Sequence, residues 1–192
     1  MIDETVNYDS GIRNYNRMLE GKRAFITTAA RGIGKSIAIL FARQGATVYF
    51  AGRNECYVRE TESELQLLAP ESRGYICDLA DGAQSEETAA LVLRDSGGID
   101  ILINTVGVNC HCAADGYKDE DMARLLETNY ISGLRFARAF IPGMRARHGG
   151  SIVNISSIHS VMTQPTNMLY AGTKGAMNAA ARAMALDCAA DG

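Results

Sequence analysis

The sequence predicts an α/β domain with a doubly wound parallel sheet, because short apolar strands alternate with amphipathic helices along most of its length. Helical segments of about 10–15 residues between strands are typical of βαβ units, and right-handed crossovers place the helices on both faces of the sheet. Small or polar residues follow the strands. Ligands of such sheets bind beyond the carboxyl ends of the strands, so we expect the functional site at that edge.

The expected strands are short runs rich in β-branched or aromatic residues, at 23–27, 47–51, 74–77, 99–104 and 151–155. The expected helices show helical apolar spacing, at 34–44, 55–68, 81–95, 119–147 and 168–189. Pro70 ends the second helix, and we expect Pro142 to interrupt the fourth, because proline lacks a backbone donor. Residues 1–20 are polar and predict an N-terminal arm with Tyr8 and Tyr15 as packing anchors, and residues 21–192 predict one domain.

Composition and charge are those of an ordinary globular chain, with 192 residues, 47% hydrophobic and 21% charged, and a formal net charge of −3. Lys and Arg are scattered among acidic residues, which argues against nucleic-acid binding. No apolar run approaches the ~18–20 residues that span a bilayer, and the polar N-terminus lacks a signal-peptide core. We therefore expect a cytoplasmic protein without membrane or nucleic-acid partners.

The five cysteines show no spacing typical of a disulfide framework. Cys56, Cys77 and Cys188 are interpreted as small buried apolar residues. The segment 110–112, Cys-His-Cys, carries three possible metal ligands, but no second cluster supplies the remaining ones. We therefore expect a reduced loop and no metal site.

The most informative pattern is Tyr170 followed by Lys174, with Ser157 upstream. Positions i and i+4 share one face of a helix, so the ammonium can lie beside the phenol. A nearby cation favours the phenolate and lowers a pKa that is ordinarily about 10, which suits proton exchange with an alcohol or carbonyl. Ser157 ends a β-branched run and could hydrogen-bond the same substrate oxygen. The Tyr–Lys spacing alone also occurs in exposed pairs without function.

Residues 27–34, TTAARGIG, connect the first strand to the first helix. Small residues there allow the backbone to approach a pyrophosphate, and the helix N-terminus supplies free N–H groups and a partial positive charge. The same turn could also be a tight strand–helix connection without a ligand.

Together these motifs resemble the short-chain dehydrogenase/reductase family, in particular its 3-oxoacyl-reductase-like and gluconate-dehydrogenase-like members. The family pattern is T-G-x-x-x-G-x-G, N-N-A-G, a helical Asn, a Ser and Y-x-x-x-K. It is met in order by TTAARGIG, NTVG at 104–107, Asn129, Ser157 and Tyr170–Lys174. The resemblance runs from about residue 21 to the C-terminus and implies a Rossmann-like three-layer α/β/α fold.

The resemblance also implies the roles of individual residues. Tyr170 would donate or accept the proton, and Lys174 would lower its pKa and hold the nicotinamide ribose. Ser157 would orient the substrate oxygen, and Asn129 would hold a water that links Lys174 to solvent. The expected coenzyme contacts, besides Tyr170 and Lys174, are Thr28, Arg31, Gly32, Ile33, Gly34, Arg53, Asp78, Leu79, Asn104 and Gly107. Asp78-Leu79 resembles the segment beside the adenine ring, and Asp78 could also cap a helix.

The charges near the expected adenosine end favour NADP(H) over NAD(H). Domains that bind NAD place an acidic residue after the second strand, where this chain has Gly52 and Arg53. Arg31 lies in the phosphate turn. Guanidinium groups match phosphate oxygens well, so we expect them to bind a 2′-phosphate.

The chain departs from the family pattern at three places. Thr28 replaces the first glycine, and because a β-branched residue adopts glycine's dihedrals reluctantly, we expect a distorted turn or a crowded pyrophosphate. Thr105 and Val106 replace Asn and Ala, and we expect the larger Val106 to narrow the cleft. Family members continue with two more strands after the helix of Tyr170, so the chain is C-terminally short and residues 151–155 are expected to form an open sheet edge.

The leading functional hypothesis is an NAD(P)-dependent oxidoreductase that interconverts a secondary alcohol and a ketone of small-molecule size. The alternative is a catalytically impaired fold that serves as a binding or interaction module. An epimerase-type enzyme is a third hypothesis, disfavoured because G-x-x-G-x-x-G is absent. Residues 119–147 and 168–189 match the helices that pair subunits in the family, which implies a homo-oligomer. His159 is either an exposed loop residue or a substrate contact.

Overall fold

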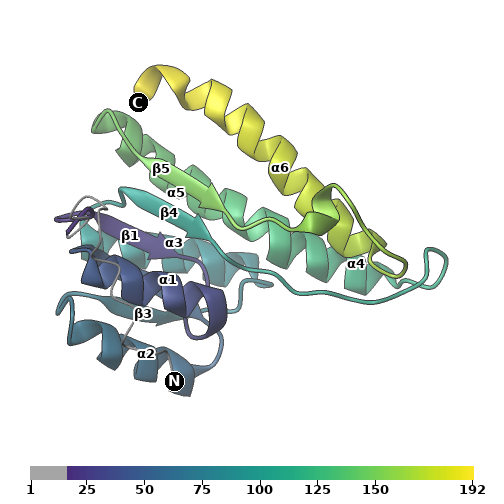
Figure 1. Ribbon diagram of the computed structural model, residues 1–192, viewed down its shortest axis with the longest axis horizontal. Helices are drawn as coiled ribbons and strands as arrows, with labels where there is room; N and C mark the ends of the chain where they lie inside the picture. The colour runs from purple at the N-terminus through teal and green to yellow at the C-terminus, as the bar shows by residue number, and fades with distance from the viewer. Residues whose placement is uncertain (1–16) are drawn as a thin grey trace, which may run out of the picture.

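The computed structural model describes residues 17–192 and shows the predicted doubly wound α/β architecture (Figure 1). The sheet of this part of the chain has five parallel strands in the order β3-β2-β1-β4-β5. They are β1 (Arg23–Ile26), β2 (Thr47–Gly52), β3 (Arg73–Ile76), β4 (Ile101–Asn104) and β5 (Ser151–Asn154). The order reverses between β1 and β4, which is the position where such sheets bind ligands. Most of the predicted N-terminal arm, with Tyr8 and Tyr15, lies outside the described residues.

Six α-helices are described, close to the predicted ranges: α1 (Gly32–Arg43), α2 (Glu55–Gln66), α3 (Gly82–Ser96), α4 (Asp119–Leu126), α5 (Ser132–Ala146) and α6 (Met168–Cys188). The prediction of a break at Pro142 is wrong, because α5 continues through it. Phe140 and Met144, on either side of the proline, are buried in the core and stabilise the helix there. The interruption is instead a π-helix, η1 (Glu127–Ile131), between α4 and α5.

The core has two halves because neighbouring residues of a strand face opposite sides of the sheet. Phe25 of β1 packs with side chains of α3 and α5, whereas the adjacent Ile26 packs with side chains of α1 and α2. The Phe25 ring lies 4.7 Å from that of Phe136 and 5.5 Å from that of Phe140, centroid to centroid. These aromatic contacts fix α5, and with it η1, against the centre of the sheet.

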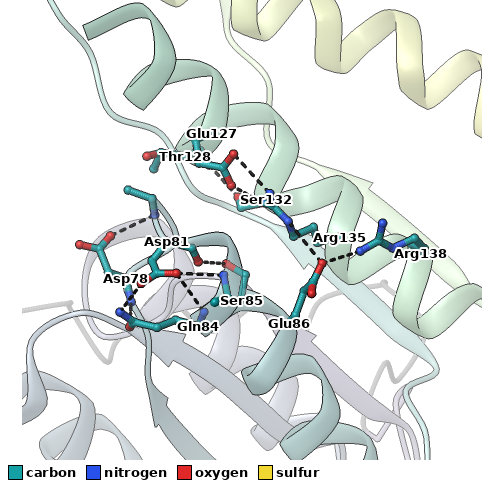
Figure 2. Close-up of polar contacts among 12 residues, drawn as sticks. Asp78, Asp81, Gln84, Ser85, Glu86, Glu127, Thr128, Ser132, Arg135 and Arg138 are labelled. Atoms are coloured by element: carbon teal, nitrogen blue, oxygen red, sulfur yellow. Dashed lines mark hydrogen bonds and ion pairs between the residues drawn. The ribbon is translucent and has the colours of Figure 1, made fainter. Parts of the chain in front are cut away.

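Polar contacts add to the packing of α3 against α5 (Figure 2). The carboxylate of Asp81 accepts hydrogen bonds from two backbone N–H groups of the first turn of α3, at 2.9 and 3.2 Å. Arg135 of α5 pairs with Glu127 of η1, and its Nε lies 3.8 Å from a carboxylate oxygen of Glu86 in α3. The start of α3, the π-helix and α5 are thereby connected.

Several smaller expectations concern burial. Cys77 is buried as expected and Cys188 is half-buried, but Cys56 is exposed because it lies on the solvent side of α2, which buries Val58 and Leu65 instead. β5 forms one edge of the sheet, as expected, and Val153 on it is 42% exposed.

No helix within residues 17–192 is both long and apolar enough to cross a membrane. The same residues contain no group of three or more His, Cys, Asp or Glu side chains that could hold a metal ion.

Asp100 connects the amino-terminal ends of β1 and β4 to the end of α5. Its Oδ2 accepts hydrogen bonds from the Arg23 backbone N–H and from Arg23 Nε, both at 3.0 Å. Its Oδ1 lies 3.2 Å from Arg147 Nε. Burial alone would raise the pKa of Asp100, but the hydrogen bonds from Arg23 and the charges of both arginines outweigh it, and the pKa is lowered.

Replacing Asp100 by Asn should lower the free energy of unfolding by about 1–3 kcal/mol at neutral pH, because hydrogen bonds to a charged group are lost. The folded pKa lies below the unfolded one, so this stabilisation is present above about pH 4 and is lost as the pH falls through the folded pKa. Urea unfolding of both proteins at about pH 7 and at lower pH measures the difference. The stabilising role of the Asp100 carboxylate would be contradicted if the difference in unfolding free energy does not shrink in acid. An equal effect of Asp115→Asn, on an exposed loop, would contradict it too.

Candidate active site

The first turns of α6 bring Tyr170 and Lys174 to the segment that follows β4. A Cβ atom built on Gly107 would lie 3.5 Å from Lys174 Nζ and 4.0 Å from the Tyr170 hydroxyl oxygen, so both polar atoms face this glycine. Lys174 Nζ lies 5.8 Å from the centroid of the Tyr170 ring. The juxtaposition of phenol and ammonium that the i,i+4 spacing predicts is therefore present.

Lys174 is an isolated charge in the interior. It is 2% exposed, and its Nζ donates hydrogen bonds to the carbonyl oxygens of Val106 at 3.1 Å and Ile155 at 2.9 Å. Within residues 17–192, no carboxylate lies within ion-pair distance of it. Burial lowers the pKa of Lys174. Because burying an unpaired charge is costly, such a lysine indicates a functional group.

Asn129 lies in the π-helix η1, a type of turn that is frequent at functional sites. It is fully buried, and its Oδ1 accepts from the Val108 N–H at 2.8 Å. Its Nδ2 donates to the Val108 carbonyl at 2.8 Å and to Thr173 Oγ1 at 3.1 Å. Thr173 Oγ1 in turn donates to the Tyr170 carbonyl at 2.8 Å. Asn129 therefore connects the segment after β4 to the helix turn of Tyr170.

Sequence reasoning missed Thr173 and Val108. Thr173 lies three residues after Tyr170, which places the two residues on one face of the helix, and this spacing is the signal that could have identified it. Val108 contributes only backbone atoms, so its identity carries no signal in a sequence.

Ser157 is the N-cap of the short 3₁₀-helix η2 (Ile158–Ser160) after β5. Its Oγ accepts a hydrogen bond from the His159 N–H at 3.2 Å, which leaves its own proton free for another acceptor. The His159 ring meets the Tyr170 ring edge to face, with centroids 5.8 Å apart, and its Nδ1 lies 3.0 Å from Thr163 Oγ1. His159 is thus a neighbour of Tyr170 rather than a free loop side chain.

The turn between β1 and α1 needs its glycines. Gly32 has a φ of +60°, a value that side-chain-bearing residues adopt reluctantly. A Cβ on Gly34 would lie 1.7 Å from the Thr28 carbonyl oxygen, so α1 begins in direct contact with the turn. This close approach brings backbone N–H groups to the ligand side of the sheet.

The N-terminus of α1 is open to an anion. Asn54 caps α2 and Asp81 caps α3, each through a side-chain oxygen, but Arg31 at the N-cap of α1 makes no such bond. The first N–H groups of α1 therefore lack a side-chain acceptor, which is the arrangement that binds phosphate in nucleotide-binding domains. The residues present at this turn fit the pyrophosphate of a dinucleotide.

Thr28 is not strained: the described non-glycine residues with positive φ are Arg17, His148 and Thr166, so Thr28 adopts ordinary dihedrals. The expectation that Thr28 crowds the pyrophosphate stays a prediction. The expectation that Val106 narrows the cleft is wrong, because its side chain is 5% exposed and packs in the core between the sheet and α5.

The remaining predicted coenzyme contacts fall into two groups. Arg31, Ile33 and Arg53 are exposed, and Arg53 Nη1 lies 3.8 Å from Asp78 Oδ2. The side chains of Leu79 and Asn104 lie inside the protein, not at the expected coenzyme site. Leu79 packs in the core, and Asn104 Nδ2 donates a hydrogen bond to Asn154 Oδ1 at 2.7 Å.

Asp78 is not the helix cap, because its Oδ1 accepts a hydrogen bond from the Ala80 N–H and Asp81 caps α3. The structure thus brings Gly32, Gly34 and Gly107 to the switch point and leaves Leu79 and Asn104 inside.

A parallel sheet with an uncapped helix at its glycine turn and a Tyr–Lys pair at the switch point defines a Rossmann-like α/β/α protein. Residues 22–192 match the family model for short chain dehydrogenases, and the chain belongs to this family.

Relatives and solved structures agree with this assignment. Gluconate 5-dehydrogenase of Gluconobacter oxydans is 34% identical, over 88% of this chain and 66% of that protein. An oxidoreductase of Mycobacterium tuberculosis is 33% identical over 86% of this chain, which spans only 50% of that relative. The structure of a 7α-hydroxysteroid dehydrogenase complexed with NADH and 7-oxo glycochenodeoxycholic acid has a TM-score of 0.87 at 30% identity, covering 94% of this chain and 70% of that one.

The buried ammonium should make stability depend on alkaline pH. Because the folded pKa of Lys174 is lowered, the unfolded chain binds this proton more tightly, and stability rises with pH up to the unfolded value near 10.4. We expect the free energy of unfolding of the wild type to increase relative to that of Lys174→Met as the pH rises toward about 10. Urea unfolding measures both, and the exposed Lys22→Met is the control. A pH-independent difference would show that burial does not destabilise the ammonium.

Proposed function

We propose that this protein is an NADP(H)-dependent oxidoreductase that interconverts a secondary alcohol and a ketone of small-molecule size. The observation that carries the proposal is the buried Lys174 ammonium, without a carboxylate partner in residues 17–192, next to the Tyr170 hydroxyl at Gly107. A tyrosine hydroxyl beside a buried cation is a group that can exchange a proton with a carbonyl or alcohol oxygen, and the reaction proposed here requires such a group. The names of the similar dehydrogenases support the same type of reaction.

The nicotinamide of the coenzyme would supply or accept the hydride. In ketone reduction Tyr170 donates its hydroxyl proton to the substrate oxygen, and Ser157 donates a hydrogen bond to the same atom. Lys174 uses two of its three protons on Val106 and Ile155, which leaves one for Tyr170 or the coenzyme ribose. Asn129 Oδ1 keeps one lone pair beside its bond to Val108, and this lone pair can hold a water that resupplies protons.

The preference for NADP(H) rests on the arginines of this chain. Arg31 and Arg53 are exposed near the expected adenosine end, and the side chain of Arg53 is 80% exposed. Its contact with Asp78 is long, at 3.8 Å, and such solvent-exposed pairs contribute little, so a phosphate can replace it. The NADH complex named above belongs to the similar hydroxysteroid dehydrogenase and does not decide the preference here.

We also propose that the protein forms a homo-oligomer through residues 119–147 and 168–189. Exposed apolar side chains on these helices support this, among them Leu186 at 81% and Met168 at 43% exposure. The molar mass in solution, measured by light scattering, tests it.

NADPH should bind about tenfold or more tightly than NADH, because a 2′-phosphate adds charge-assisted hydrogen bonds. Arg53→Ala should remove most of this difference, whereas Arg43→Ala, at the other end of α1, should not. Fluorescence titration measures both coenzymes, and thermal shifts report the same order. Equal affinities would overturn the coenzyme preference, and no binding of either coenzyme would favour the binding-module alternative.

Tyr170→Phe should lower turnover by about 10²–10⁴-fold or more while coenzyme affinity stays nearly unchanged, since general acid–base catalysis contributes that much. A panel of ketones followed by NADPH absorbance gives the rates, and the titration above gives the affinity. Turnover that survives this substitution would show that another group transfers the proton.

A further inference from the structure

The two threonines that depart from the family motifs contact each other, although 77 residues separate them in the sequence. Thr105 Oγ1 lies 3.2 Å from the Thr28 backbone nitrogen, 2.9 Å from Thr28 Oγ1 and 2.8 Å from the Thr28 carbonyl oxygen. A hydroxyl has one proton and two acceptor lone pairs. Its proton goes to the Thr28 carbonyl, so it accepts from the N–H and the hydroxyl of Thr28. The proton and both lone pairs of the Thr105 hydroxyl are therefore all engaged in hydrogen bonds with Thr28.

The neighbouring residue extends this contact. The Thr105 N–H donates to Thr27 Oγ1 at 3.0 Å, and the Thr27 N–H donates to the Ile103 carbonyl at 3.0 Å. Thr27 is fully buried. The first turn after β1 is thus fixed to the end of β4 by four hydrogen bonds that involve a threonine side chain.

The position of Thr28 also determines where α1 begins. Its carbonyl accepts from Thr105 on one side and is in direct contact with Gly34 on the other, where not even a Cβ would fit. Any displacement of Thr28 therefore moves the first turn of α1. The N–H groups of that turn are the ones without a side-chain cap.

We propose that Thr28 and Thr105 are a coupled pair of positioning residues that holds the open end of α1 in the place where the coenzyme pyrophosphate binds. This inference rests on the proposed coenzyme function. The Thr28 hydroxyl proton is donated to Thr105, so Thr28 acts through position and not as a phosphate donor. Thr28→Gly, although it restores the residue of the family motif, removes this bond and adds backbone freedom. It should weaken coenzyme binding rather than improve it.

The test is NADPH titration of Thr28→Val, Thr28→Gly, Thr105→Val and the Thr28→Val/Thr105→Val double variant, well below their melting temperatures. We expect about three- to tenfold weaker binding for each single variant. The double variant should bind no more weakly than Thr105→Val, because loss of Thr105 already removes the partner of Thr28. Thr28→Ser keeps the hydroxyl and should bind like the wild type. Thr47→Val, the same change at the amino end of β2, is the matched control.

The outcomes distinguish a failure of the proposed Thr28–Thr105 pair from a failure of the proposed function. If the wild type binds NADPH but the single Val variants bind equally well, or if the losses add in the double variant, the pair is overturned and the proposed function stands. Lower melting temperatures with unchanged affinity also overturn it, because they show a structural role only. If the wild type binds neither NADPH nor NADH, both the proposed pair and the proposed function are overturned. If Thr105→Val does not fold, the comparison of Thr28→Val with Thr28→Ser decides alone.

Discussion

The ammonium of Lys174 is the group on which the rest of the site depends. It is buried without a carboxylate partner in residues 17–192, and carbonyl oxygens of Val106 and Ile155 take the place of water around it. These carbonyls come from the segments after β4 and β5, which are neighbours in the sheet. The strand order therefore brings together the two carbonyl oxygens that replace water around the ammonium. A parallel sheet provides such a place because its strands end at the same edge.

Hydrogen bonds of Asn129 and Thr173 hold the segment that surrounds Lys174 in place. Asn129 joins the backbone of Val108 to Thr173, and Thr173 joins Asn129 to the carbonyl of Tyr170. None of these bonds is placed to contact a substrate directly. They fix the segment after β4, which contains Gly107, against the first turns of α6. Buried networks of this kind specify one geometry when every member is satisfied.

The strands, the helices and the Tyr–Lys juxtaposition could be predicted from the sequence, because they follow from local periodicity. The failures concern residues whose environment is set by distant parts of the chain. Pro142 does not break α5, because the burial of Phe140 and Met144 outweighs the lost backbone bond. Thr28 was expected to strain its turn, but its partner Thr105 comes from another strand end. Asp78 and Asp81 are both plausible caps, and only the observed start of α3 selects Asp81.

The π-helix has an unexpected consequence for how this protein can vary in length. A π-turn holds one residue more than an α-turn, so removing one residue from Glu127–Ile131 would restore regular α-helix and leave α4 and α5 in register. Phe136 and Phe140 would keep their contacts with Phe25, whereas the same deletion early in α5 would rotate them by about 100° about the helix axis. A deletion in the π-helix would therefore spare the aromatic core and disturb the placement of Asn129.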